Sequence, residues 1–414
     1  MKKVIHNLGS RLLLLLNIAI LLACVPCALC AQQQWQIEVV DGGPGKNVGK
    51  FTSLAADKDG NLHVGYYDET RQALRYGFRD ATTHKWYTME VDASGGYESV
   101  AVDAEGHPHF AYAAPNEGGL RYATWDGSKW NKQTIDPERI DFFNFIRIGP
   151  DGLPRISYYH RLHRDGSFAL HLKYAYFNAK EKSWYTETVD ARSATGKFNS
   201  LALDSKGLPY ISYSDVDTGD LRYTKFNGSE WTFSSPDTQK QSEGWVGIGS
   251  SIEIDQAGNP HIAYVDVTHR RIKYASWTDK GWKPEVVDTM VGKSDNIDRI
   301  SLKFDSKQQP HLAYWDSGLG VLRHATLTPK GWRAETVDSA DTVGLYPSLA
   351  IDANDEIYIS YYDMSNGVLR LAHKRAATSQ EDRQDKAAKL EKEAEVVIKM
   401  TNNLPVALKL TGYQ

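Results

Sequence analysis

Short stretches of alternating apolar and polar residues recur along the chain, and turn-forming residues separate them. Four kinds of stretch follow one another, and the clearest examples are Ser200–Asp204 (Ser-Leu-Ala-Leu-Asp), His261–Asp266 (His-Ile-Ala-Tyr-Val-Asp), Leu120–Ala123 (Leu-Arg-Tyr-Ala) and Trp184–Asp190 (Trp-Tyr-Thr-Glu-Thr-Val-Asp). Alternation over four to eight residues rich in aromatic and β-branched side chains is typical of strands. The pattern therefore predicts an all-β protein.

The fourth kind of stretch shows how many repeats the chain has. In every copy of it, a tryptophan is followed six residues later by an aspartate. The seven pairs are Trp35 and Asp41, Trp86 and Asp92, Trp130 and Asp136, Trp184 and Asp190, Trp231 and Asp237, Trp282 and Asp288, and Trp332 and Asp338. Four strands that recur about every 50 residues are typical of propeller blades. We predict a seven-bladed β-propeller with four-stranded blades over residues 35–376.

The ends of the repeat array predict how the ring closes. Trp35–Asp41 stands before the first complete set of strands, and the last repeat ends after Leu369–Arg375 without a tryptophan strand. Pairing the N-terminal strand with the last repeat would remove an exposed strand edge. We therefore expect Trp35–Val40 to complete the seventh blade. The Ser-Leu-Ala strand is then innermost and the tryptophan strand outermost.

Residues 1–31 are predicted to be an export signal. They hold three basic residues and no acid, namely Lys2, Lys3 and Arg11. The apolar run Leu12–Ala23 is too short to span a bilayer. Cleavage after Ala31 competes with lipidation of Cys24, and we favour cleavage because Pro26 lies where a cleavage region begins. The protein is expected to be periplasmic or extracellular, with an outer-membrane lipoprotein as the alternative.

The cysteines and the end of the chain lie outside the repeats. All three cysteines (Cys24, Cys27 and Cys30) fall in the signal segment, so we interpret them as part of it and predict neither a metal site nor a cofactor. Residues 377–414 are predicted to form a short α/β tail, with a charged helix followed by a hairpin. The formal charge is −4 and the cations are scattered. Nucleic acid is therefore excluded as a partner, and a membrane is expected only through a lipid anchor.

The repeat resembles that of a group of secreted bacterial and archaeal propellers, whose blades read SLALDxxGxPHISYYD…LRYA…WxxExVD. Ser200–Asp215, Leu221–Tyr223 and Trp184–Asp190 carry the resemblance, which covers residues 35–375. It implies the propeller fold and hardly bears on function. Blade 3 departs from the pattern, because Phe145–Gly149 replaces the Ser-Leu-Ala-x-Asp stretch.

Residues that recur in blade after blade are interpreted as scaffold. Four histidines share one place in different blades (His63, His109, His261 and His311), and we expect each to bond a local aspartate rather than a metal. A column of cations comprises Arg75, Arg121, Lys173, Arg222, Lys273, Arg323 and Arg370. We expect it to pair across strands with Glu38, Glu187, Glu285 and Glu335.

Candidates for ligand binding lie where the repeat is broken. The expected loop of residues 160–166 contributes His160, Arg161, His163 and Arg164, and the insertion Thr238–Gly249 contributes Trp245. Glu98, Asn144, Arg299 and Tyr346 begin inner strands and are expected at the mouth of the central channel. The alternative is that the loop is merely solvated and that Trp245 covers the mouth or packs on a neighbouring blade.

A second break in the repeat concerns one position of the inner strands, which is alanine in four of the blades. Blades 3, 5 and 6 carry Arg147, Glu253 and Lys303 where the other blades have alanine. Charges are not left unpaired inside proteins. We therefore expect a network of ion pairs that lines the channel, with contact to a bound ligand as the alternative.

Function is predicted from what the sequence contains and what it lacks. No nucleophile elbow, metalloprotease motif or phosphate loop occurs. The leading hypothesis is an exported, non-catalytic protein that presents a polar and aromatic face to a carbohydrate, peptide or protein. The rival is a glycosidase or polysaccharide lyase that uses Glu98, Asp141 and Asp298 with His160. A third hypothesis is an assembly scaffold that uses the C-terminal tail.

Overall fold

The computed structural model describes residues 35–114, 119–138, 140–164, 167–192, 194–238, 244–291 and 299–375. For residues 140–142, 162–164, 167 and 168 it describes the backbone alone. The predicted signal, with Cys24, and the predicted C-terminal tail lie outside the described residues. Within the described ranges, no helix has the length and apolar character needed to cross a membrane.

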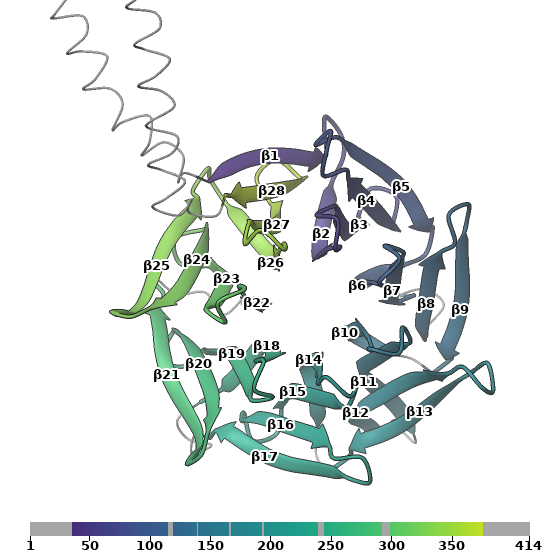
Figure 1. Ribbon diagram of the computed structural model, residues 1–414, viewed down its shortest axis with the longest axis vertical. Helices are drawn as coiled ribbons and strands as arrows, with labels where there is room; N and C mark the ends of the chain where they lie inside the picture. Colours follow the sequence, from purple (N-terminus) through teal and green to yellow (C-terminus); the bar gives the residue numbers. More distant parts are fainter. Residues whose placement is uncertain are drawn as a thin grey trace, which may run out of the picture. The chain divides into compact units, whose positions relative to one another are not determined.

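The strands form seven four-stranded antiparallel sheets, which stand as blades around a centre (Figure 1). We number the blades from β2–β5 (blade 1) to β26–β28 with β1 (blade 7). The inner strands are β2 (Val48–Ala56), β6 (Gly96–Val102), β10 (Ile140–Ile148), β14 (Thr195–Leu203), β18 (Val246–Ile254), β22 (Ile300–Phe304) and β26 (Val343–Ile351). The second strands are β3 (Leu62–Asp68), β7 (Pro108–Ala113), β11 (Pro154–Arg164), β15 (Pro209–Asp215), β19 (Pro260–Asp266), β23 (Pro310–Asp316) and β27 (Ile357–Asp363).

The outer half of each blade has the same regularity. The third strands are β4 (Ala73–Arg79), β8 (Leu120–Trp125), β12 (Ser167–Asn178), β16 (Leu221–Phe226), β20 (Arg271–Thr278), β24 (Val321–Thr328) and β28 (Val368–Lys374). The outer strands are β5 (Trp86–Asp92), β9 (Trp130–Asp136), β13 (Ser183–Asp190), β17 (Trp231–Asp237), β21 (Gly281–Thr289), β25 (Gly331–Asp338) and β1 (Gln36–Asp41). The prediction of an all-β, seven-bladed propeller is confirmed.

The ring closes as the ends of the repeat array predict. Strand β1 pairs antiparallel with β28, so that Gln36 faces His373 and Asp41 faces Leu369. Figure 1 shows β1 at the outside of the last blade, beside β28. The first strand of the propeller therefore completes the last blade and joins the two ends of the array.

Blades are held together by apolar side chains and by the serines of the inner strands. Leu74 of blade 1, for example, packs in one buried cluster with Val100 and Phe110 of blade 2. The hydroxyl of Ser53 accepts a hydrogen bond of 3.0 Å from the backbone amide of Val100 in the next blade. Equivalent bonds to the next blade are made by Ser99, Ser200, Ser251, Ser301 and Ser348. We call this set the serine column; Phe145 replaces it in blade 3.

A second device joins the outer parts of the blades. A tyrosine hydroxyl of each second strand donates to the aspartate that ends the outer strand of the preceding blade, at 2.5–2.7 Å in six pairs. The pairs are Tyr66–Asp41, Tyr112–Asp92, Tyr158–Asp136, Tyr213–Asp190, Tyr264–Asp237, Tyr314–Asp288 and Tyr361–Asp338. We call these pairs the inter-blade clamps. Burial of the tyrosines raises their pKa, so the hydroxyls stay protonated as donors.

The cation column belongs to these clamps, which corrects the expected pairing with glutamates. Arg75 lies 3.3 Å from Asp41, Lys173 lies 2.6 Å from Asp136, and Arg370 lies 3.0 Å from Asp338. Arg121, Lys273 and Arg323 pair with the clamp aspartates in the same way, whereas Arg222 pairs with Asp215. The prediction failed because the strand register does not bring the glutamates opposite the cations. Lys173 stands opposite Thr188, for example, and Glu187 stands opposite Tyr174.

Three of the four recurring histidines bond local aspartates, as expected. His63 lies 3.3 Å from Asp57, and His109 and His261 make the same contact at 3.2 Å with Asp103 and Asp255. His311 lies 3.6 Å from Asp305.

Candidate functional site

The inner strands place one side chain per blade at the point where the strand begins. Two positions before the serine column stand Phe51, Tyr97, Phe143, Phe198, Gly249, Arg299 and Tyr346. Five of these seven residues are aromatic, and we call Phe51, Tyr97, Phe143, Phe198 and Tyr346 the aromatic collar. The sequence analysis selected Tyr346 and missed the other four.

A backbone irregularity aims the collar side chains. The pairing of the inner with the second strand shifts at this point in blades 1, 2, 4, 5 and 7. Four collar residues have a positive φ, namely Phe51 (57°), Tyr97 (55°), Phe198 (53°) and Tyr346 (53°). A bulge of this kind re-aims a side chain, and the left-handed conformation costs a bulky residue on the order of 1–3 kcal/mol. Surrounding contacts must therefore hold the collar in place.

The collar rings contact one another across blade boundaries. The ring centroid of Phe51 lies 4.2 Å from that of Tyr97 and 4.5 Å from that of Tyr346. In the same way, the centroid of Phe143 lies 4.5 Å from that of Phe198. All five rings remain partly accessible to solvent. Such contacts between inner strands place the collar around one mouth of the channel.

Two blades interrupt the collar. Gly249 leaves its place without a side chain in blade 5, and Arg299 takes the place in blade 6. A guanidinium nitrogen of Arg299 lies 3.4 Å from the carbonyl oxygen of Thr52 in blade 1. The arginine therefore extends past blade 7 toward the rings of the first blade.

Polar side chains one position further along hold the collar backbone from the next blade. Asn144 donates to the carbonyl of Tyr97 at 2.6 Å. Asn199 donates to the carbonyl of Phe143 at 3.0 Å, and the Ser250 hydroxyl lies 2.9 Å from the carbonyl of Phe198. We call this position the seat; it comprises Thr52, Glu98, Asn144, Asn199, Ser250, Ile300 and Pro347. In these three blades the seat therefore supports the collar residue of the preceding blade.

Serines of the second strands contact the side chains of some of these seats. Ser157 donates to Asn199 at 2.6 Å, and the hydroxyls of Ser212 and Ser250 lie 2.9 Å apart. Ser360 contacts Thr52 in the same way.

Two of the five seats with polar side chains lack this serine. Ala111 takes the place equivalent to Ser157 in blade 2, and the side-chain carbonyl of Asn144 in the next blade is buried and has no hydrogen-bond partner. Gly65 faces Glu98, and a Cβ atom at Gly65 would lie 2.5 Å from a ring carbon of Phe110 and 3.0 Å from Cγ of Glu98. The absence of a side chain at Gly65 therefore makes room for both neighbours.

Glu98 is the most unusual group of the seats. Its side chain is buried with 0% exposure, and neither carboxyl oxygen accepts a hydrogen bond from another residue. Burial raises the pKa of Glu98 to about 8, although its own backbone amide and Arg299 act in the opposite direction. The group is therefore uncharged at neutral pH, and it cannot touch a ligand at the solvent-accessible surface.

His160 does not lie in a loop, which corrects the prediction for residues 160–166. His160–Arg164 belong to strand β11, which extends its hairpin with β12. Of the candidates next to it, Arg161 is partly buried, and the side chains of His163 and Arg164 lie outside the described residues. The loop interpretation failed because the backbone pairing of the hairpin continues through this segment, from His160 opposite His171 to Arg164 opposite Ser167.

The surroundings of His160 offer three metal-ligating groups. One ligand atom each of Asp136, Glu138 and His160 lies within 4.8 Å of the others, and Nε2 of His160 is 2.8 Å from Glu138. The ammonium of Lys173, however, lies 2.6 Å from Asp136. It already supplies the positive charge there, and together with burial it lowers the pKa of His160. A metal would have to displace this lysine.

Trp245 lies apart from the collar contacts. It precedes β18, its side chain is 42% exposed, and its backbone amide donates to Thr268 at 3.0 Å. The indole packs against the turn of blade 4 at Gly219.

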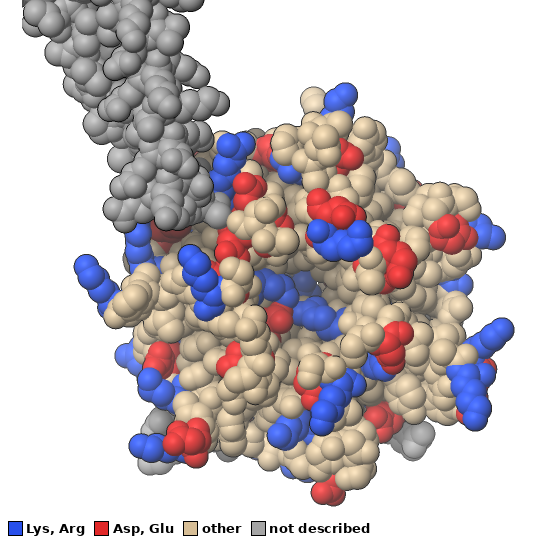
Figure 2. Space-filling model, in the orientation of Figure 1, with Lys and Arg blue, Asp and Glu red and all other residues tan. Residues whose placement is uncertain are grey.

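Arg147, Glu253 and Lys303 meet in the channel. Arg147 lies 3.1 Å from Glu253, and Lys303 contacts the same carboxyl oxygen. Burial and the nearby Arg147 lower the pKa of Lys303, although Glu253 opposes them. These residues lie four positions after the collar in their strands, roughly 13 Å away along the strand direction. Figure 2 shows basic and acidic side chains around the central opening of the disc.

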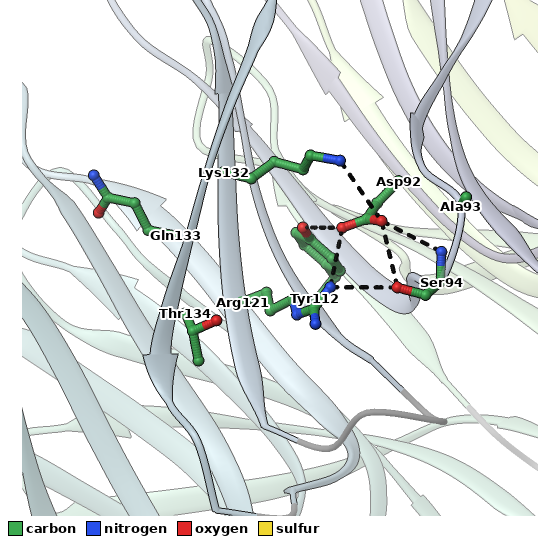
Figure 3. Close-up of a pocket in the computed structure, with 8 residues that line it drawn as sticks. All are labelled: Asp92, Ala93, Ser94, Tyr112, Arg121, Lys132, Gln133 and Thr134. Carbon is green, nitrogen blue, oxygen red and sulfur yellow. Dashed lines mark hydrogen bonds and ion pairs between the residues drawn. The ribbon is translucent and has the colours of Figure 1, made fainter.

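Two cavities between blades lie outside the channel. One of about 490 Å³ is lined by residues of blades 1 and 2, including Asp92, Tyr112, Arg121 and Lys132. Figure 3 shows these polar groups directed at Asp92, which is the acceptor of an inter-blade clamp. The other cavity, of about 440 Å³, is lined by the bonded Asp255 and His261. The polar groups that line both cavities make contacts that also occur in other blades, so they are part of the scaffold.

Comparison with known proteins gives distant structural likenesses and no family. No protein-family model matches the chain. No curated protein matches it either. Among solved structures, 381 chains match.

Three of these structures show how distant the likenesses are. A mutant of AofleA from Arthrobotrys oligospora is 12% identical, with a TM-score of 0.49 over 75% of this chain and 91% of that chain. The NanB sialidase from Streptococcus pneumoniae is 13% identical, with a TM-score of 0.45 over 81% and 70%. The polysaccharide lyase Uly1 is 10% identical, with a TM-score of 0.49 over 78% and 89%. At these identities and scores, no activity is carried over to this chain.

Proposed function

We propose that the propeller is a non-catalytic binding protein that takes a carbohydrate at the aromatic collar, after export from the cytoplasm. The observation that supports this proposal most strongly is the collar itself. Five of seven blades place an aromatic ring at the same channel mouth, and four of them do so through a strained backbone. Such strain persists only where surrounding contacts support it, and it concentrates at functional sites.

The chemistry of the collar suits a carbohydrate. Aromatic faces carry a partial negative charge and attract the partly positive C–H groups of a sugar ring. A lysine stands beside one of the rings, since the ammonium of Lys197 lies 5.0 Å from the ring centroid of Phe198. Apolar faces next to a few polar groups are typical of small-molecule sites. Gly249 leaves room for a ligand on one side of the collar.

A catalytic function is supported less well. The rival hypothesis requires two carboxyl groups about 5–10 Å apart that reach the substrate. Glu98 is fully buried, and the side chains of Asp141 and Asp298 lie outside the described residues. The scaffold hypothesis depends on residues 377–414, and deletion of this tail without loss of partner binding would eliminate it.

The proposal is tested with a glycan array and a peptide array probed with the mature protein, followed by calorimetry on the best glycan. We expect a glycan to bind without being cleaved. Tyr346→Ala should weaken binding about tenfold, because a stacked aromatic ring contributes about 1.4 kcal/mol. Tyr87→Ala is the matched control, because Tyr87 is 53% exposed on an outer strand.

Three results would contradict the proposal. They are equal binding by wild type and Tyr346→Ala, capture of peptides with no glycan bound, and turnover of a polysaccharide by the purified protein.

A further inference from the structure

We propose that Glu98 positions the aromatic collar as an uncharged carboxylic acid, which donates a hydrogen bond to the backbone carbonyl of Phe51. Glu98 occupies the seat of blade 2, and Phe51 is the collar residue of the preceding blade. The ligand-binding consequence rests on the proposed function, whereas the protonation of Glu98 can be tested without any ligand.

The first argument is the equivalence of the seats. In blades 3, 4 and 5 the seat side chain is Asn144, Asn199 or Ser250, and each is bonded to the carbonyl of the preceding collar residue. These residues all carry an N–H or O–H group that can donate. By equivalence, the carbonyl of Phe51 is the acceptor that the Glu98 seat serves.

The second argument is the chemistry of a carboxyl group. A carboxylate only accepts hydrogen bonds, whereas a carboxylic acid has one O–H donor. Glu98 can therefore do what Asn144 and Ser250 do only while it keeps its proton. An ionised carboxylate at the seat would repel the carbonyl oxygen of Phe51, because both groups carry negative charge on their oxygen atoms.

The third argument is the environment of Glu98. Its side chain has 0% exposure, and Gly65 offers no hydroxyl where Ser157, Ser212 and Ser360 stand in other blades. Burial without a hydrogen bond from another residue favours the neutral form of a carboxyl group.

Charged and titratable groups around Glu98 do not reverse this balance. Arg299 lowers its pKa, but by less than burial raises it. Burial raises the pKa values of Tyr67 of β3 and Tyr97 of β6, and the nearby Glu69 and Glu98 raise them further. Both tyrosines are neutral hydroxyls at neutral pH, so they bring no opposite charge that would stabilise the carboxylate.

Because of the position of Phe51, the hydrogen bond to its carbonyl affects the arrangement of the collar. Its ring lies between those of Tyr97 and Tyr346, with centroids 4.2 and 4.5 Å away, and its φ of 57° is strained. Loss of the bond to its carbonyl would release the middle ring of three. Ionisation of Glu98 is therefore expected to weaken both the packing of blades 1 and 2 and the ligand platform.

The first experiment measures unfolding of wild type and Glu98→Gln by denaturant at several pH values from 5 to 9. The folded protein holds the Glu98 proton up to a pKa of about 8, whereas the unfolded chain releases it near the ordinary value of 4.5. Stability is therefore lost as pH rises through this window. We expect the folding equilibrium constant of wild type to fall, relative to Glu98→Gln, by up to about tenfold per pH unit until pH 8.

Glutamine keeps the size and a donor but cannot ionise, so Glu98→Gln isolates the titration of this one group. Glu98→Ala removes the donor and should show a deficit, relative to Glu98→Gln, that does not depend on pH. Parallel pH profiles of wild type and Glu98→Gln would overturn the proposal. A fall in relative stability toward low pH would overturn it too, because it would show a carboxylate that needs its charge.

The second experiment repeats the titration of the best glycan at pH 6 and pH 9. Wild type should bind at least tenfold more weakly at pH 9, whereas Glu98→Gln should bind equally at both. If the stability profiles behave as expected and no glycan binds at all, the proposed function fails while the protonation of Glu98 stands. If a glycan binds and both proteins show the same change with pH, Glu98 does not position the collar.

Discussion

The outer part of every blade boundary is the same, whereas the part beside the channel differs from one boundary to the next. At the outside, a tyrosine and an aspartate form an inter-blade clamp at all seven boundaries. At the inside, the seat is a serine pair between blades 4 and 5, an amide without its serine between blades 2 and 3, and a buried acid between blades 1 and 2.

This difference separates the contacts that hold the blades together from the positions that can adapt to a particular function. A contact that every boundary needs is made by the same residues each time, because each blade must be fixed to its neighbour in the same geometry. Positions whose residue differs from blade to blade can instead fit a partner without sevenfold symmetry, such as a ligand at the channel mouth. The two seats whose buried side-chain oxygens accept no hydrogen bond from another residue, Glu98 and Asn144, lie in the neighbouring blades 2 and 3.

Breaking a clamp is expected to have the largest effect on stability. Asp338→Ala removes the acceptor of the Tyr361 hydroxyl at 2.5 Å and one of the carboxylates that pair with Arg370. We expect a loss of about 3 kcal/mol in the free energy of unfolding, measured in urea, because buried partners are left unpaired. The control is Asp59→Ala, since Asp59 is 65% exposed and pairs with an exposed lysine. It should change stability by less than about 0.5 kcal/mol. Equal effects would show that the clamps do not hold the blades.

Filling the space at Gly65 is expected to have an intermediate effect. Gly65→Ser would introduce the serine of the other seats at a place that Phe110 and Glu98 already occupy. Overpacking of this kind costs about 1–3 kcal/mol, measurable as a lower midpoint of urea unfolding. A neutral or stabilising result would mean that Glu98 moves away easily, which would contradict its role as a fixed support.

The matching substitution in the next blade is expected to have the smallest effect and the opposite sign. Ala111→Ser would give the unpartnered carbonyl of Asn144 a hydroxyl donor, as Ser157 gives Asn199. One new buried hydrogen bond contributes about 1 kcal/mol, so the urea midpoint should rise. If Ala111→Ser destabilises the protein as much as Gly65→Ser does, the new hydroxyl does not serve Asn144, and the proposed difference between these two boundaries fails.

Much of the fold could be predicted from the sequence, because repetition averages out local ambiguity. Seven copies of Trp and Asp at one spacing define the blades, and the unpaired Trp35–Asp41 strand defines the closure. The roles of individual residues were harder to predict. The cation column was assigned to the wrong carboxylates because sequence shows neighbours within a sheet and not the contact from one blade to the next.

The candidate site could be predicted only in part. Tyr346, Arg299, Asn144 and Glu98 were selected because they begin inner strands, and the structure places Arg299 and Tyr346 at the collar position and Glu98 and Asn144 at the seat. Aligning the position two residues before the serine column would have revealed the other four aromatic residues. No sequence pattern shows the positive φ of the collar or the burial of Glu98, since both arise from packing between blades.

The most direct test of the central claim, that the aromatic collar is the ligand site, is a crystal structure of the mature protein with the best glycan from the array. We expect a sugar ring against the exposed faces of Phe51 and Tyr346, beside the place that Gly249 leaves open. A glycan bound instead in the cavity between blades 1 and 2, or at the outer strands, with the collar untouched, would contradict the account.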